Sequence, residues 1–118
     1  SAILIDANMT NAILISANLE NVDLTGADLS SADLTSADLE NADLTSTTLT
    51  SANMLYATLT GAKLTNAVGL VDAVQLRGAT ITGADLSGTG ITLLKVQAHN
   101  VLANAPEDIS TDPLSWGN

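Results

Sequence analysis

The stretch ADLSSADLTSADLENADLTS, residues 27–46, repeats nearly the same five residues four times. Each unit contains an alanine, an aspartate, a leucine, a polar residue and a small polar residue, in that order. An amphipathic helix has a period of about 3.6 residues and a strand has a period of 2, so neither accommodates a repeat of five. The sequence therefore predicts a chain that turns once in every unit.

The same unit extends far beyond this stretch in both directions. With the leucine taken as the central position, the register runs unbroken through thirteen units that carry eleven leucines and two methionines there. Eleven of the thirteen residues two places earlier, the inner position, are alanine. The central residues are Leu4, Met9, Leu14, Leu19, Leu24, Leu29, Leu34, Leu39, Leu44, Leu49, Met54, Leu59 and Leu64.

Local geometry converts this period into a shape. Residues two apart in an extended chain point to the same side, so the inner and central residues face one interior. The residue two places after the central one, the corner position, is usually Asn, Ser or Gly, which are turn formers. Four such units close a square coil of 20 residues, and the coils stack at the strand spacing of about 4.8 Å. Leucine then fills the axis, and alanine fits the tighter inner corners.

The pattern is interrupted after Leu64, because the next central leucine is two residues late. This predicts an irregular corner at about residues 67–75, with Leu70 in place of a central leucine. Two interpretations remain open: an insertion tolerated on the outside of the solenoid, or a recognition loop that carries Val71 and Asp72. The register resumes at Leu76, Ile81, Leu86 and Ile91.

Beyond residue 91 the apolar spacing becomes helical. Thr92 is suited to the N-cap of a helix, and Pro106 to its end. The end of a stack of coils leaves unpaired backbone groups that invite aggregation, and solenoids need caps there. We therefore predict two parts: a solenoid over residues 1–91, and a capping α-helix with a tail over residues 92–118.

The repeat resembles that of the pentapeptide repeat proteins, and the resemblance covers residues 1 to about 91. It implies an all-β solenoid, namely a right-handed quadrilateral β-helix, here of about 4.5 coils with the C-terminal α-helix as its cap. Short, leucine-centred, helix-capped members are common in cyanobacteria and in the thylakoid lumen. The resemblance therefore points to a photosynthetic source.

The composition bounds the partners and the compartment. The chain has 118 residues and a formal net charge of −10, with 13 acidic residues against 3 basic ones. This balance argues against direct binding to nucleic acid or to an anionic membrane, both of which attract basic surfaces. No run reaches the roughly 18 apolar residues of a membrane span. The sequence predicts a soluble protein of the cytoplasm, or of the thylakoid lumen or periplasm if a signal was removed; Ser1 starts directly on the repeat, as in a processed or trimmed chain.

No arrangement of residues points to catalysis, a metal or a cofactor. His99 is the only histidine and has no nucleophile at a recognisable spacing. Five aspartates, the acidic belt, directly precede central leucines and point outward on successive sides of the coil. We expect them to be solvated and hydrogen-bonded to the backbone of the adjacent turns. They are Asp23, Asp28, Asp33, Asp38 and Asp43.

Apolar residues at outward positions are the stronger signal for binding. Four isoleucines of the first coil stand where other units carry polar residues, and Leu55 and Tyr56 share a face with two of them. Exposed apolar patches usually mark contacts. Either residues preceding Ser1 cover them, or they form an interface, with a second copy or with another protein. The four are Ile3, Ile5, Ile13 and Ile15.

These observations predict a non-enzymatic scaffold that presents a rigid acidic rod to a protein partner. The alternative is DNA mimicry, known in the fluoroquinolone-resistance members of the family, in which an acidic rod occupies the duplex site of a type II topoisomerase. Three departures oppose it. The chain has no central Phe, its rod is only about 22 Å long at strand spacing, and its charge is concentrated near residues 20–43.

Overall fold

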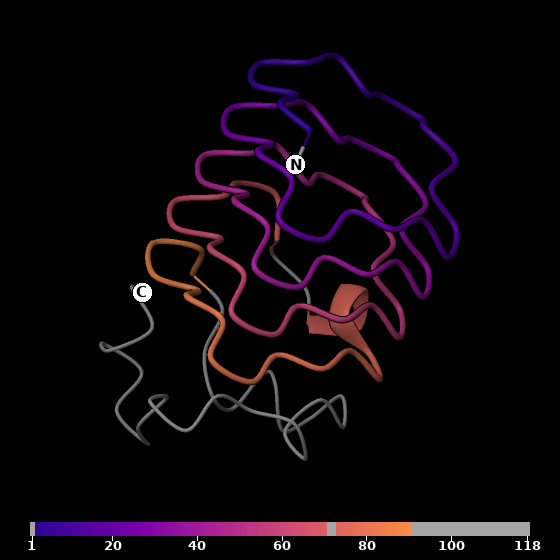
Figure 1. Ribbon diagram of the computed structural model, residues 1–118, viewed down its shortest axis with the longest axis vertical. Helices are drawn as coiled ribbons and strands as arrows, with labels where there is room; N and C mark the ends of the chain where they lie inside the picture. The colour runs from indigo at the N-terminus through magenta and orange to yellow at the C-terminus, as the bar shows by residue number, and fades with distance from the viewer. Residues whose placement is uncertain (1, 71–72, 91–118) are drawn as a thin grey trace.

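The chain winds into a stack of four-sided coils (Figure 1). The computed structural model describes residues 2–70 and 73–90. A residue before a central leucine pairs in a parallel bridge with the residue 20 places later, as in Ile3 with Asp23, Asp23 with Asp43 and Asp43 with Lys63. Four five-residue units therefore make one coil, as the sequence predicts. The strand pairing in the described part of the chain consists of such isolated bridges.

On each regular side, three backbone hydrogen bonds join a coil to the next. Two N–H groups of the earlier coil, at the central and corner positions, donate to the later coil: Leu34 N donates to Asn53 O at 2.7 Å, and Ser36 N to Leu55 O at 2.8 Å. One N–H returns, from Asn53 to the carbonyl of Ala32 at 2.9 Å. The stack is thus directional, because a coil gives two hydrogen bonds forward for each one that it receives.

Each side ends in a tight turn whose third residue has a positive φ. The N–H of Ala37 donates to the carbonyl of Leu34 at 3.0 Å, and the corner residue between them, Ser36, has φ 59°. A positive φ at the third residue alone defines a type II turn, which favours Gly or Asn there. The corner residues that lie in this left-handed region without being glycine are Asp6, Asn11, Ser16, Asn21, Ser31, Ser36, Asn41, Ser46, Ser51, Tyr56 and Asn66.

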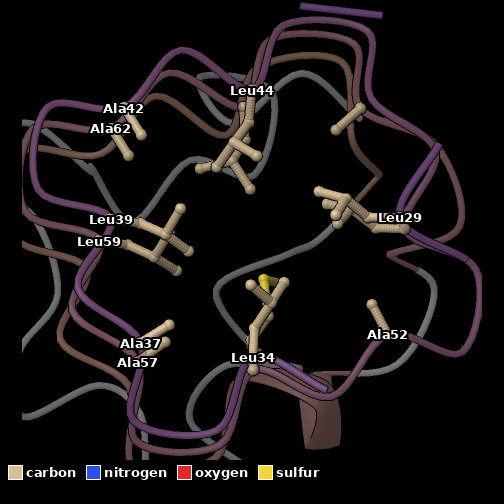
Figure 2. Close-up of a cluster of buried hydrophobic side chains, with 14 of the residues drawn as sticks. Leu29, Leu34, Ala37, Leu39, Ala42, Leu44, Ala52, Ala57, Leu59 and Ala62 are labelled. Atoms are coloured by element: carbon tan, nitrogen blue, oxygen red, sulfur yellow. The ribbon is translucent and has the colours of Figure 1, made fainter. Parts of the chain in front are cut away.

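The interior is a column of aliphatic side chains. Figure 2 shows Leu29, Leu34, Leu39 and Leu44 converging from the four sides, with alanines between them. Every central residue from Leu24 to Leu64 is fully buried. Thr47, at an inner position, is also buried, and its hydroxyl donates to the carbonyl of Leu44 at 2.8 Å. A polar residue is tolerated there because the turn supplies its acceptor.

The two extra residues lie between Val68 and Gln75. Bridges span 20 residues up to Thr48 with Val68, and 22 residues from Thr58 with Thr80 onward. A short 3-10 helix, η1 (Ala73–Leu76), lies at this corner (Figure 1). Leu70 and Leu76 are fully buried, so Leu70 occupies the interior as expected. The 3-10 helix was not predicted, and the predicted cap over residues 92–118 lies outside the described residues.

Candidate interaction surfaces

The acidic belt is part of the turn structure. Asp33 Oδ1 accepts the backbone N–H of Thr35 at 3.0 Å and the hydroxyl of Thr35 at 2.6 Å. Asp23, Asp28 and Asp43 make the same pair of bonds with the residue two places later, and Asp38 accepts the N–H of Glu40 at 3.0 Å. These are Asx turns, in which a side chain satisfies a backbone donor. The expected bonding of these carboxylates to the turn backbone is present.

Hydrogen bonding also favours the ionised form of three carboxylates of the belt. The Ser30 hydroxyl and N–H lower the pKa of Asp28, and the Thr35 hydroxyl and N–H lower the pKa of Asp33. The Thr45 hydroxyl, assisted by its N–H and by Lys63, lowers the pKa of Asp43 against the opposing effect of burial. Donors that point at a carboxylate favour its charged form. The charged forms of Asp28, Asp33 and Asp43 are therefore stabilised by the turns that they close.

The first coil carries a different outer surface. Ile3 and Ile13 occupy the positions of the Asx-turn aspartates and are 75% and 81% exposed; Ile5 and Ile15, two places after them, are 50% and 54% exposed. Ile3 pairs with Asp23 on one side, and Ile13 pairs with Asp33 half a coil further on. The four isoleucines therefore form two pairs on opposite sides of the coil, not one patch.

Leu55 and Tyr56 lie two coils further along the Ile15 side. The N–H of Ser16 donates to the carbonyl of Thr35, and the N–H of Ser36 donates to that of Leu55, so Thr35 lies between Ile15 and Leu55. Leu55 is half-buried, whereas Tyr56 is 62% exposed. The two residues are thus separated from the isoleucines by a polar coil.

A groove beside Leu55 marks the irregular corner. It has a volume of about 250 Å³, and Ala52, Asn53, Leu55 and Gln75 line it. The Gln75 side-chain amide donates to the carbonyls of Leu49 and Ala52, both at 3.0 Å. In a regular side the carbonyl of Ala52 would accept a backbone N–H of the next coil, as the carbonyl of Ala57 accepts that of Thr80. The glutamine side chain therefore replaces a missing backbone bond.

Sequence reasoning missed this role of Gln75. The only available signal was its place directly before Leu76, where the register resumes after two extra residues. A long side chain with an N–H donor at that point can repair a displaced backbone, but the pattern alone does not show which carbonyl it reaches.

The described residues offer no catalytic or metal-binding cluster. In residues 2–70 and 73–90, no three His, Cys, Asp or Glu side chains come close enough together to hold a metal ion. His99 lies outside the described residues. None of the helices in the described part of the chain is long and apolar enough to cross a membrane. The surfaces with distinctive chemistry are therefore the acidic belt, the first coil and the groove.

Comparison with known proteins matches this geometry. The pentapeptide repeat family model matches residues 1–30 and 27–66, in eight copies. A pentapeptide repeat protein from Nostoc Pcc 7120 has a similar structure, with a TM-score of 0.70 and 34% identity over 93% of this chain and 81% of that one. No curated protein matches the sequence at a significant level.

Two further structures are similar over smaller shares of their length. Rfr23, a pentapeptide repeat protein from the cyanobacterium Cyanothece 51142, has a TM-score of 0.54 and 40% identity over 71% of this chain and 52% of that one. QnrB1, a plasmid-mediated fluoroquinolone resistance protein, has a TM-score of 0.52 and 18% identity over 86% of this chain and 64% of that one. The likeness to QnrB1 at this identity concerns the fold alone.

The stacked square coils, the leucine axis and the left-handed corners define a right-handed quadrilateral β-helix. The chain belongs to the pentapeptide repeat family, and its solved relatives include cyanobacterial proteins.

Proposed function

We propose that this protein is a non-enzymatic scaffold whose first coil binds a protein partner. The observation that carries the proposal is the exposure of Ile3, Ile5, Ile13 and Ile15 at positions where the second coil has Asp with Thr. Aliphatic side chains so exposed are costly in water and gain on burial, at about 25 cal/mol per Å² of apolar area. A contact that covers them explains why this coil departs from the polar pattern.

The arrangement of the polar residues supports a scaffold over an enzyme. Paired acid and base groups need a shared cleft that shifts their pKa values in opposite directions. Here the belt aspartates lie on successive sides of a convex rod, and each shifted pKa among them moves downward for the same local reason. Such carboxylates hold turns and present charge to a partner.

Photo-crosslinking from the first coil tests the proposal. A photoreactive residue in place of Ile13 should capture a specific protein in extract from the source organism. The same residue in place of Asp33, one coil away on the same side, is the matched control and should not. A variant that carries the photoreactive residue at position 13 together with Ile3→Asn, Ile5→Thr and Ile15→Thr should no longer capture the protein. Equal capture from both positions would contradict an interface at the first coil.

A second candidate function is mimicry of DNA toward a type II topoisomerase, and the acidic belt is the observation that favours it. The charge is sparse for that role. The longest dimension of the protein is 34 Å, a length over which duplex DNA carries about 20 charges at one per ~1.7 Å, against a net −10 here. Inhibition of gyrase supercoiling at low micromolar concentration, lost in an Asp28→Asn, Asp33→Asn double variant, would establish mimicry.

We further propose that the solenoid has about 4.5 coils and that residues 92–118 form its helical cap. The repeat register up to Ile91 and the helical spacing that follows support this division. Removal of residues 93–118 should then cause association of the truncated chain, because the last coil would present an open edge. A truncated chain that stays monomeric and equally stable would show that these residues are not a cap.

A further inference from the structure

Tyr56 is the one bulky residue at a left-handed corner of the described coils. It has φ 60°, whereas the other non-glycine residues at such corners are Asp, Asn or Ser. A positive φ is uncommon for a bulky residue, and Asn and Gly adopt it more readily. The Tyr56 side chain is 62% exposed, so the core does not require it. A strained residue that the fold does not need indicates a role outside the fold.

The next coil makes room for the tyrosine ring. The ring carbons Cδ1 and Cε1 of Tyr56 lie in the space that a Cβ of Gly78 would take, so any side chain there would displace the ring. Leu55, which directly precedes Tyr56, is half-buried and lines the groove at the irregular corner. The corner thus presents an exposed aromatic side chain directly after an aliphatic one that lines a groove.

The groove offers one hydrogen-bond donor and one acceptor. Asn53 Oδ1 accepts the N–H of Leu55 at 3.0 Å, and no hydrogen bond from the described residues engages Asn53 Nδ2. The Nε2 group of Gln75 donates to two backbone carbonyls, and its Oε1 accepts nothing in the same part of the chain. Each residue of an extended peptide carries one N–H and one carbonyl, which match this acceptor and this donor. The groove therefore suits a peptide main chain.

The size of the groove favours a side chain of a larger partner over a small molecule. Its volume is about 250 Å³, below the roughly 300–1,000 Å³ of the usual small-molecule sites. The walls include Ala52 and Leu55, which suit an aliphatic side chain. The occupant that fits is an extended segment of a protein that places one aliphatic side chain in the groove.

Arg77 supplies an unpaired positive charge beside Tyr56. The N–H of Tyr56 donates to the carbonyl of Arg77 at 3.0 Å, which places Arg77 directly after Leu55 in the column of outer residues. Arg77 is exposed, and it forms no ion pair within residues 2–70 and 73–90. A guanidinium binds a carboxylate through two parallel N–H donors. An acidic segment is therefore complementary to this corner, although the protein itself has a net charge of −10.

Lys63, the other basic residue that the structure describes, has different neighbours. It lies between Asp43 and Asp85 in its column, and it pairs with both in parallel bridges. Two carboxylates therefore offset the charge of Lys63, whereas the residue before Arg77 in its column is the apolar Leu55. Lys63 is thus a matched control for Arg77.

We propose that the irregular corner is a docking site for an extended acidic segment of another protein. An aliphatic side chain of the segment enters the groove beside Leu55, and its main chain pairs with the side chains of Asn53 and Gln75. A neighbouring Asp or Glu of the segment binds Arg77, and the Tyr56 ring packs on the segment. The site lies apart from the first coil, so it goes beyond the function proposed above and does not depend on it.

A second copy of this chain fits the site less well. Its belt aspartates could supply a carboxylate, but they lie in coils whose main chain is already paired with the coils on both sides, as at Asp33 and Asp43. That main chain has no N–H and carbonyl left for Asn53 and Gln75. A segment outside such a ladder has both.

Peptide selection on the intact protein tests the proposal. A phage library of short random peptides is selected on the protein, and the enriched peptides are synthesised with both ends blocked. We expect them to share an aliphatic residue next to Asp or Glu. Arg77→Gln and Tyr56→Asn should each weaken binding of such a peptide at least about tenfold. Lys63→Gln should change it by less than about twofold, as expected for an exposed charge outside the contact.

A double-mutant cycle locates the carboxylate of the peptide. Replacing its Asp or Glu by the amide should weaken binding to the parent protein and leave binding to the Arg77→Gln variant unchanged. Additive losses overturn the proposal, as does an equal loss with Lys63→Gln or the absence of an enriched acidic peptide. Self-association of the parent chain that Arg77→Gln abolishes overturns it in favour of a second copy.

Folding of the variants is checked separately. Asn is found at other left-handed corners, so Tyr56→Asn should keep the circular dichroism spectrum of the parent. If this variant does not fold, the cycle between Arg77→Gln and the peptide amide decides the outcome, because the exposed Arg77 side chain makes no contact that the fold requires.

Discussion

The first coil, residues 2–21, and the second coil, residues 22–41, share one backbone and differ in what they carry outside. In the second coil Asp33 bonds to Thr35 across the turn, whereas in the first coil Ile13 and Ile15 take these places without changing the turn, since Ser16 and Ser36 have φ values of 58° and 59°. The fold therefore depends on the leucine axis and the left-handed corner. The two outward positions are left free to define the surface.

The largest expected effect concerns the central leucines that fill the axis of the coils. Leu34→Ala should lower the free energy of unfolding by about 2–5 kcal/mol, the usual cost of a cavity at a fully buried leucine. Leu14→Ala, at the equivalent half-buried place one coil earlier, should lower it by less than half as much. Urea unfolding of the two variants measures both. Equal losses would mean that the first coil is as enclosed as the second.

The next largest effect concerns the irregular corner, where backbone hydrogen bonds alone do not fully join the two coils. Gln75→Glu keeps the shape but removes the N–H donor that reaches the carbonyls of Leu49 and Ala52. We expect a loss of about 1–3 kcal/mol, because the carbonyl of Ala52 loses its donor, while the carbonyl of Leu49 keeps only the backbone N–H of Ala52. Thr80→Val, at the same position of the following side, should cost under about 0.5 kcal/mol. Similar losses from both changes would mean that the Gln75 amide is not needed.

A smaller effect separates charged from neutral Asx turns in one column. The Asp28 carboxylate accepts the N–H of Ser30, and the Asn8 side chain accepts that of Thr10, one coil earlier. Because the pKa of Asp28 is lowered from 3.8 in the folded state, its contribution to stability is complete above that value and is lost as the pH falls through the folded pKa.

Nuclear magnetic resonance measures this difference directly. The amide signal of Ser30 should titrate at a pH below 3.8, and that of Thr10 should not titrate with it. Asp28→Asn is the control and should remove the titration of Ser30. A midpoint at or above 3.8 would contradict a carboxylate stabilised by these donors.

The smallest effect is expected when the first coil is given the surface of the second. Ile13→Asp combined with Ile15→Thr reproduces the pair at Asp33 and Thr35, and the free energy of unfolding should stay within about 0.5 kcal/mol of the parent. Thermal unfolding and circular dichroism measure this. A large loss of unfolding free energy would show that these isoleucines stabilise the coil. It would contradict their interpretation as an interface.

The sequence was sufficient to predict the coil, the register and the corners. A period of five with alternating inner and central residues permits only a chain that turns once per unit, and the break after Leu64 located the two extra residues. It was not sufficient to predict η1 or the bonds of Gln75, because both depend on how two coils meet across a displaced turn. The isoleucine pairs lie on opposite sides because they are ten residues apart, which is half of a 20-residue coil. This placement could be predicted from the coil geometry alone.

The left-handed corners have a consequence for how such a rod grows over evolutionary time. At four corners the side chain of one coil occupies the space that a Cβ of the next would need: Asp6 over Gly26, Asn41 over Gly61, Tyr56 over Gly78 and Asn66 over Gly88. A gene duplication that copies one of these coils places the bulky corner residue above an identical residue, instead of above the glycine that makes room for it. Where a corner glycine receives the side chain of the preceding coil, the heritable unit is then a matched pair of successive corners. Other pairs, such as Asn21 over Asn41, stack two non-glycine corners and do not carry this restriction.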